Sequence, residues 1–310
     1  MSANAHNEVT PENFLVFSVI IPAHNPRPEF LTRVLAALRA QTLPSTRWEL
    51  LLIDNASSAP VAADLTWHPH ARILREPILG LTAARLAGFS AAQGEWLVLV
   101  DDDNVLAPDY LEQILALTTA HPQLGSGSGC VRLEFQAGAV PPPPAWRGFL
   151  AERTCTAPHM SRDPGHNDST PWGAGMFIRR EVAEAYSHQV RNDPRRLQLD
   201  LQGGQLIYGG DTDIAFTGCD LGFDKGVFPQ LQLDHLIPAS RCSRDYLIRA
   251  AEGHGYSEIL HALLRDGRLP PQRPAWHEWL ARLRLPHEQR IIATARARGI
   301  ARARNFFINQ

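Results

Sequence analysis

Short apolar runs alternate with amphipathic stretches along the first 120 residues, and this alternation constrains the fold more than any other feature. The apolar runs lie at 16–21, 48–53, 71–74 and 95–100, and helical patterns lie at 29–40, 81–92 and 108–120. Strands that are apolar throughout are typical of a parallel sheet covered by helices on both faces. The sequence therefore predicts an α/β fold that begins in the order β-α-β-β-α-β-α.

The pattern changes after residue 124. Strands are predicted at 125–135, 173–178 and 227–235, and helices at 211–221, 243–264 and 276–307. Residues 136–171 are predicted to form a long loop, because they hold the proline run 141–144 and a further cluster of turn-forming residues at 161–171. A loop of this length inside a compact domain is typically functional.

Charge and cysteine content exclude several classes of protein. The net charge of the 310 residues is −2, which argues against nucleic acid as a partner. The charge is uneven, because residues 241–310 contain 13 arginines and six acidic residues, a balance of +7. The four cysteines form no CxxC pair, so neither a zinc cluster nor a disulfide scaffold is expected.

No apolar run approaches the roughly 18 residues that cross a bilayer, and residues 1–13 are polar, so we expect a cytoplasmic protein. The basic segment 290–307 adds a second expectation. Its arginines alternate with Ile and Phe, and a helix of this kind can contact the inner face of the plasma membrane peripherally. The alternative is a solvated helix packed against the domain, since Gly299 interrupts the segment.

Three aspartates and an asparagine directly follow the strand predicted at 95–100. Ligands of open parallel sheets bind outside the carboxyl ends of the strands. Asp101, Asp102 and Asp103 would repel one another there unless a cation neutralised them, and Mg²⁺ or Mn²⁺ held by carboxylates commonly carries a substrate's phosphates. A structural alternative is that Asp103 or Asn104 only helps to cap the helix predicted after Pro108.

The same cluster has a second chemical interpretation. LVLVDDDNV resembles the motif of haloacid-dehalogenase-type phosphatases, with Asp101 as nucleophile and Asp103 as acid. The order of the motifs argues against it, because that family's nucleophile follows the first strand and its lysine precedes the last acidic motif. Here the cluster comes late, and Lys225, the only lysine, follows Asp213.

Several segments together are similar to the family 2 glycosyltransferases of the GT-A fold. They are SVIIPAHNPRPEFL (18–31), LLIDNAS (51–57), GLTAARLAGFSAA (80–92), EWLVLVDDDNVLAPDYLE (95–112), WGAGMFIRRE (172–181), YGGDTDIAFTGCDLGF (208–223) and DHLIPASR (234–241). The resemblance implies a Rossmann-like nucleotide-binding sheet fused to a mixed-sheet acceptor region, with C-terminal helices. The implied domain spans 14–265, with a nucleotide-sugar half at 14–124 and an acceptor half at 125–265, followed by a basic helical extension at 266–310.

The resemblance also implies roles for individual residues. Those implied for nucleotide-sugar binding are Pro22, Ala23, His24, Asn25, Asp54, Arg85, Asp101, Asp102, Trp172 and Gly173. Asp101, Asp103 and His235 are implied as ligands of Mn²⁺ or Mg²⁺, and Asp211 as the catalytic base. Each also has a structural alternative: Asp54 as a turn residue, Arg85 as a solvated charge, His235 as a core histidine and Asp211 as a helix cap.

One position departs from the family pattern. The family usually has Glu-Asp where this chain has Gly210-Asp211, so the base is kept and its acidic neighbour is lost. The sequence as a whole predicts an inverting, metal-assisted glycosyltransferase that moves a sugar from a UDP-sugar to a saccharide or lipid-linked acceptor in polysaccharide or glycoconjugate biosynthesis. The alternative that remains open beside the phosphatase is a catalytically degenerate GT-A fold that only binds.

Overall fold

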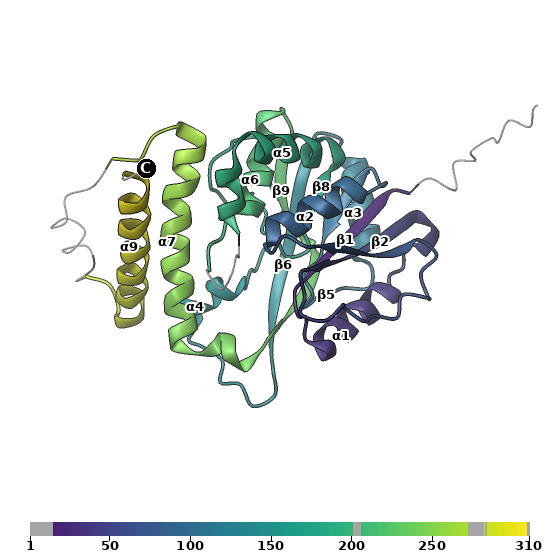
Figure 1. The fold of residues 1–310 in the computed structure, drawn as a ribbon, viewed down its shortest axis with the longest axis horizontal. Helices are drawn as coiled ribbons and strands as arrows, with labels where there is room; N and C mark the ends of the chain where they lie inside the picture. The colour runs from purple at the N-terminus through teal and green to yellow at the C-terminus, as the bar shows by residue number, and fades with distance from the viewer. Residues whose placement is uncertain (1–14, 201–205, 272–281, 283, 309–310) are drawn as a thin grey trace, which may run out of the picture.

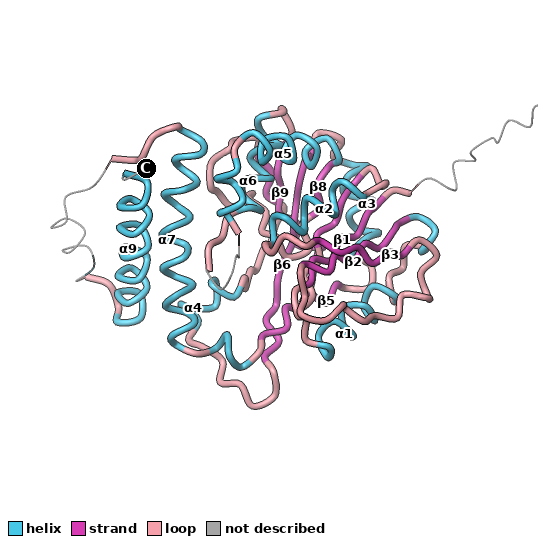
Figure 2. Tube along the Cα trace, viewed as in Figure 1, coloured by secondary structure: helices cyan, strands magenta, loops and turns pink. Residues whose placement is uncertain are grey.

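The computed structural model describes residues 15–200, 206–271, 282 and 284–308, and within them one mixed sheet of nine strands carries helices on both faces (Figures 1 and 2). The strands are β1 (Phe17–Ala23), β2 (Trp48–Asn55), β3 (Ala71–Glu76), β4 (Trp96–Leu99), β5 (Asn104–Leu106), β6 (Leu124–Phe135), β7 (His159–Ser161), β8 (Phe177–Arg179) and β9 (Asp224–Ile237). The helices are α1 (Pro28–Arg39), α2 (Leu81–Ala91), α3 (Tyr110–Ala120), α4 (Pro144–Arg147), α5 (Arg180–Asn192), α6 (Gly210–Asp220), α7 (Arg244–Asp266) and α9 (His287–Ile308).

The strand order is β3-β2-β1-β4-β8-β6-β9-β5, with β7 paired to β9. Strands β3, β2, β1 and β4 are parallel, as their continuous apolar sequences predict. Beyond β4 the sheet becomes mixed, because β8 runs antiparallel to both β4 and β6 while β6 and β9 are parallel. This arrangement confirms the predicted fold class.

Alternate residues of the parallel strands pack on opposite faces of the sheet. Val19 and Ile21 of β1 join the cluster that contains the buried side chains of α1 and α3. Ile20, between them, joins the cluster formed by α2, α5 and α6. Because both faces are buried, polar side chains that serve a substrate can lie only at the ends of the strands.

The last two helices form a separate layer. In Figure 2, α7 and α9 lie side by side at the end of the molecule away from β3. The arginines of α9 contact α7, since Arg296 pairs with Glu258 at 2.9 Å and Arg298 pairs with Glu252 at 2.5 Å. Among the helices that the structure describes, none combines the length and apolar character needed to cross a membrane.

Several predicted elements have different bounds in the structure. The strand expected at 173–178 begins only at Phe177, because Gly175 adopts φ +67° and turns the chain. The Tyr110 hydroxyl donates to the carbonyl of Gly175 at 2.8 Å. The loop expected at 136–171 contains α4 and β7. The helix expected at 276–307 is described as α9 from His287, and residues 272–281 and 283 lie outside the described part of the chain.

Candidate active site

A cavity of about 1300 Å³ lies at the carboxyl ends of β1, β2 and β4 and extends to α7. The predicted site residues that line it are Pro22, Ala23, His24, Arg85, Asp101, Asp102, Asp103, Trp172, Gly173, Asp211 and His235. Asn25, which follows β1, and Asp54, near the end of β2, are not in its lining. The fold thus brings predicted site residues from both 14–124 and 125–265 to one cavity.

The three aspartates form the turn between β4 and β5. The amide of Asn104 donates to the carbonyl of Asp101 at 3.0 Å and closes this turn, and the Asn104 side chain donates to Asp103 at 3.0 Å. Burial, together with the charges of Asp103 and Asp101, raises the pKa of Asp102 to about 7. Burial and the charge of Asp103 also raise the pKa of Asp101. The turn therefore concentrates carboxyl groups that a cation would stabilise in the charged form.

Asp103 already has a guanidinium and an imidazole beside it. Its carboxylate lies 3.1 Å from Nη1 of Arg241 and 3.4 Å from Nε2 of His235. Burial alone would raise the pKa of Asp103, but His235 and Arg241 outweigh it and lower that pKa to about 2. Asp103 is therefore ionised at neutral pH.

His235 is oriented by a backbone carbonyl. Its Nδ1 lies 2.8 Å from the carbonyl oxygen of Leu150, which can only accept, so Nδ1 donates and Nε2 faces Asp103. Burial would lower the pKa of His235, yet the charge of Asp103 and the hydrogen bond to it raise it. Fixing one ring nitrogen in this way is typical of histidines that bind metals through the other.

The donor chemistry of Asp101, Asp103 and His235 fits a divalent cation, because carboxylate oxygens and an oriented imidazole converge on one turn. Within the described residues, however, no group of three or more His, Cys, Asp or Glu side chains is already arranged to hold a metal. Arg241 supplies the positive charge beside Asp103 in this structure. A cation at this turn would compete with Arg241 for the same carboxylate.

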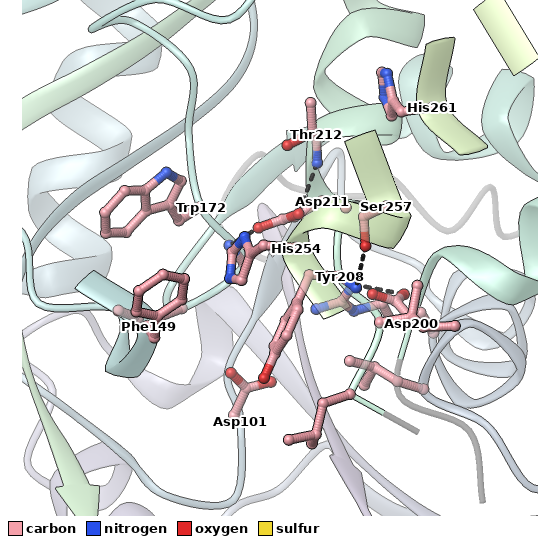
Figure 3. A pocket seen from close by; sticks show the side chains of 18 of the residues that line it. Asp101, Phe149, Trp172, Asp200, Tyr208, Asp211, Thr212, His254, Ser257 and His261 are labelled. Atoms are coloured by element: carbon pink, nitrogen blue, oxygen red, sulfur yellow. Dashed lines mark hydrogen bonds and ion pairs between the residues drawn. The ribbon is translucent and has the colours of Figure 1, made fainter. Parts of the chain in front are cut away.

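Asp211 lies at the start of α6, on the other side of the cavity. Gly209 precedes this helix with φ +118°, a conformation that favours glycine, and so turns the chain into it. The Oδ2 atom of Asp211 accepts from the amide of Gly173 at 2.7 Å, and Oδ1 accepts from the amide of Thr212 at 2.8 Å. Both oxygens are thereby fixed, and the carboxylate lies among the cavity side chains (Figure 3).

Comparison with known proteins agrees with this geometry. The profile of glycosyl transferase family 2 matches residues 18–187, which is more than half of the chain. The chain belongs to glycosyl transferase family 2. The match ends before Asp211 and His235, so their place in the site rests on the structure and on the motifs around them.

Two curated relatives and one solved structure illustrate the family. The succinoglycan biosynthesis protein ExoW of Rhizobium meliloti is 32% identical over 101 residues, which is 30% of this chain and 31% of that protein. The undecaprenyl-phosphate 4-deoxy-4-formamido-L-arabinose transferase of Pseudomonas savastanoi pv. phaseolicola is 30% identical over 109 residues, 32% of each protein. The crystal structure of GalNAc-T7 with UDP, GalNAc and Mn²⁺ has a TM-score of 0.54 and 19% identity, covering 83% of this chain and 50% of that one.

The structural likeness to GalNAc-T7 shows the GT-A fold. The chain spans only about one third of the length of the two curated relatives. For other curated relatives the share is between 9% and 36%. What those proteins bind or transfer is therefore a property of the relatives, and for this family 2 chain it enters only as a proposal.

Two predicted residues of this family 2 chain, Asn25 after β1 and Asp54 near the end of β2, lie outside the cavity lining. Asp54 is buried, and its carboxylate accepts from the amides of Ser57 at 3.1 Å and Val61 at 3.3 Å and pairs with Arg75 at 2.5 Å. Burial would raise the pKa of Asp54, but these hydrogen bonds lower it. Asn25, with φ 47°, fixes the neighbouring loop by accepting from the amide of Ser58 at 2.9 Å. Both shape the loops around the cavity in this structure.

A wall of aromatic and imidazole rings lines the cavity, and of these rings only Trp172 was a predicted site residue. Tyr208 stacks on His254 with ring centroids 4.4 Å apart, and Phe149 contacts His254 edge-on at 5.1 Å (Figure 3). Arg153 lies over the ring of Trp172 at 4.7 Å. An apolar lining with a few fixed polar groups is typical of small-molecule sites. Trp172 and Tyr208 begin segments that carry the family resemblance, whereas Phe149, Arg153 and His254 lie outside those segments and meet the other rings only in the folded chain.

Proposed function

We propose that this chain is an inverting glycosyltransferase that moves a sugar from a nucleotide-diphosphate donor to an acceptor hydroxyl. The observation that carries the proposal is that the acidic turn at Asp101–Asp103 and the fixed carboxylate of Asp211 line the same cavity. A donor whose diphosphate lies at the acidic turn would present its sugar towards Asp211. Such an arrangement needs a cation at one end and a base at the other.

Asp211 is the group we assign as general base. An acceptor hydroxyl is a weak nucleophile, and a carboxylate that takes its proton during attack accelerates the reaction. Hydrogen bonds from Gly173 and Thr212 hold Asp211 in one orientation, which suits a group that must meet one hydroxyl. A single base opposite the leaving group gives inversion, because no second carboxylate has to act as nucleophile.

Asp101, Asp103 and His235 are the residues that would hold Mn²⁺ or Mg²⁺, and Asp102 would add negative charge beside them. A bound divalent ion supplies positive charge to the diphosphate leaving group. GalNAc-T7 was crystallised with UDP and Mn²⁺, which supports a UDP-sugar and a divalent ion here. Pro22, Ala23 and His24 line the cavity beside the acidic turn, where the nucleotide would lie.

For the acceptor we propose a saccharide or a lipid-linked sugar carrier. The name of the undecaprenyl-phosphate transferase among the relatives supports a lipid-linked acceptor, and the name of the succinoglycan biosynthesis protein supports polysaccharide assembly. Peripheral membrane contact through α9 belongs to the same proposal, because Phe306 and Ile308 are exposed at its end. Flotation with anionic vesicles that is lost on truncation after Leu285 would support this contact.

The decisive experiment measures UDP release from candidate UDP-sugars with and without Mn²⁺ and saccharide acceptors. We expect turnover that requires the metal, stops in EDTA and is abolished by Asp103→Ala. A matched control is Asp64→Ala, which removes an exposed carboxylate far from the cavity lining. Full activity in EDTA would contradict the metal assignment. Nucleotide binding without turnover would favour the degenerate fold, and release of inorganic phosphate from phosphate esters would favour the phosphatase.

A further inference from the structure

We propose that Asp200 is a positioning residue of the active site, and that its carboxylate takes the place that a side chain at position 210 would otherwise fill. The inference rests on the transferase function proposed above and explains the glycine where the family usually has glutamate. Asp200 directly follows the short helix Pro194–Leu199 and lines the cavity. No motif in the sequence points to it.

Gly210 is a glycine for reasons of space. It is absent from the positive-φ residues, so its backbone conformation does not demand glycine. A Cβ atom added to it would lie 2.3 Å from Oδ2 of Asp200, 2.7 Å from its Cγ and 2.8 Å from its Oδ1. All three atoms of the Asp200 carboxylate thus surround the place of the missing side chain. An aspartate at 210 would put its own carboxylate in the same volume.

The carboxylate of Asp200 holds Arg85. Oδ2 of Asp200 accepts from the Thr82 hydroxyl at 2.8 Å and from Nη1 of Arg85 at 3.1 Å. Side-chain exposures are 8% for Asp200 and 4% for Arg85, so the pair is shielded from water. Burial raises the pKa of Asp200 to about 6. A charged pair with so little solvent is costly to keep, which points to a role beyond packing.

Arg85 lines the cavity where the two substrates would meet, and its hydrogen bond to Asp200 uses only Nη1. Its Nε is buried and has no hydrogen-bond partner. Its Nη2 lies 2.9 Å from the place of a Cβ on Gly173, the residue whose amide binds Asp211. The charges of Asp101 and Asp211 both act on this guanidinium. Held by Asp200, Arg85 can therefore donate to a hydroxyl oxygen of the sugar at the point of transfer.

The test compares kinetics and melting temperature for Asp200→Asn, Asp200→Ala, Gly210→Asp and the exchange Asp200→Ala/Gly210→Asp. Asp200→Asn keeps the shape but removes the charged partner of the buried Arg85. We expect kcat/KM to fall by about 10- to 100-fold, together with a lower melting temperature. Gly210→Asp alone should lower the melting temperature, because two carboxylates would share one space. The exchange should recover both the melting temperature and part of kcat/KM relative to each single variant.

Asp213→Asn is the matched control, because Asp213 forms a buried pair with Arg196 on the side of α6 away from the cavity lining. It should lower the melting temperature and leave kcat/KM of the folded protein unchanged. The proposal is overturned if Asp200→Asn behaves like this control, or if the exchange recovers nothing. If the wild type shows no turnover with any donor, the transferase function fails. The recovery of melting temperature then still decides whether position 210 can take over the Asp200 carboxylate.

Discussion

Two aspartates at the start of α6 lie two residues apart and have opposite environments. Asp211 lines the cavity and accepts two backbone hydrogen bonds. Asp213 is fully buried and pairs with Arg196, and burial raises its pKa despite that partner. Residues two apart on a helix point in nearly opposite directions, so only one of these carboxylates can serve the cavity.

This difference yields a prediction for Asp211→Asn. If Asp211 is the general base, kcat should fall by about 10²–10⁴-fold while donor affinity changes little. Asparagine keeps one of the two backbone hydrogen bonds, so the melting temperature should fall only slightly. Steady-state kinetics and titration with the nucleotide measure the two effects separately. An active Asp211→Asn beside an inactive but folded Asp213→Asn would reverse the assignment.

Sequence motifs were sufficient to find the residues that follow strands or begin helices. Asp101, Asp103 and Asp211 all lie in such positions, and the structure brings them to one cavity. Asp200 lies in none of the segments that carry the family resemblance. Arg241 ends the segment 234–241, but nothing in that segment assigns it to Asp103. Arg241 is 138 residues from its partner Asp103, and no local pattern encodes that distance.

At the scale of elements, α7 forms one wall of the cavity and places His254 and the buried His261 in it. His261 is 8% exposed, packs edge-on against Phe216 with ring centroids 5.3 Å apart, and has no hydrogen-bond partner for Nε2. Burial, with the charges of His166 and Arg265, lowers the pKa of His261 to about 4. His254, on the same helix, has its pKa lowered to about 4 chiefly by burial.

Because the pKa values of His254 and His261 are lowered in the folded chain, we expect the free energy of unfolding to fall in acid. The unfolded chain binds their protons below a pKa of about 6.5, whereas the folded chain binds them only near 4, so stability falls as pH drops through this window. For His261 the loss between pH 7 and pH 5 is about 2 kcal/mol. We expect His261→Phe to unfold in urea with a pH dependence smaller by that amount. Replacing the exposed His188 by Phe should leave the pH dependence unchanged, and equal profiles for all three proteins would contradict the prediction.

The strands β1, β2 and β4 were the most predictable elements, because their continuous apolar runs predict burial on both faces. The apolar run of β3 is partly exposed, with Ile73 at 45%. The segment 173–176 was less predictable. It has the composition of a strand, but Gly175 turns the chain beneath the hydroxyl of Tyr110, a contact between residues 65 apart. The segment 159–161 was predicted as loop but forms β7, because it pairs with the N-terminal end of β9. Local sequence does not reveal this pairing.

At the scale of the whole molecule, α9 is bound closely to α7. Ala295, Gly299 and Ala303 are buried and recur every four residues, so they form one face of the helix. A Cβ added to Gly299 would lie 1.8 Å from the carbonyl oxygen of Glu252 in α7. The other face of α7 lines the cavity with His254, Ser257 and His261. The C-terminal helix therefore supports the wall of the active site.

This contact makes Gly299→Leu a test of how the two layers depend on each other. Leucine favours helix, so a loss of stability would come from the contact with α7, and overpacking of this kind costs about 1–3 kcal/mol. The exposed position 301 gives the control, since Ala301→Leu should change stability by less than about 0.5 kcal/mol. Because α7 also forms the cavity wall, Gly299→Leu should weaken acceptor binding more than nucleotide binding. A variant that melts and binds like the wild type would mean that α9 does not support α7.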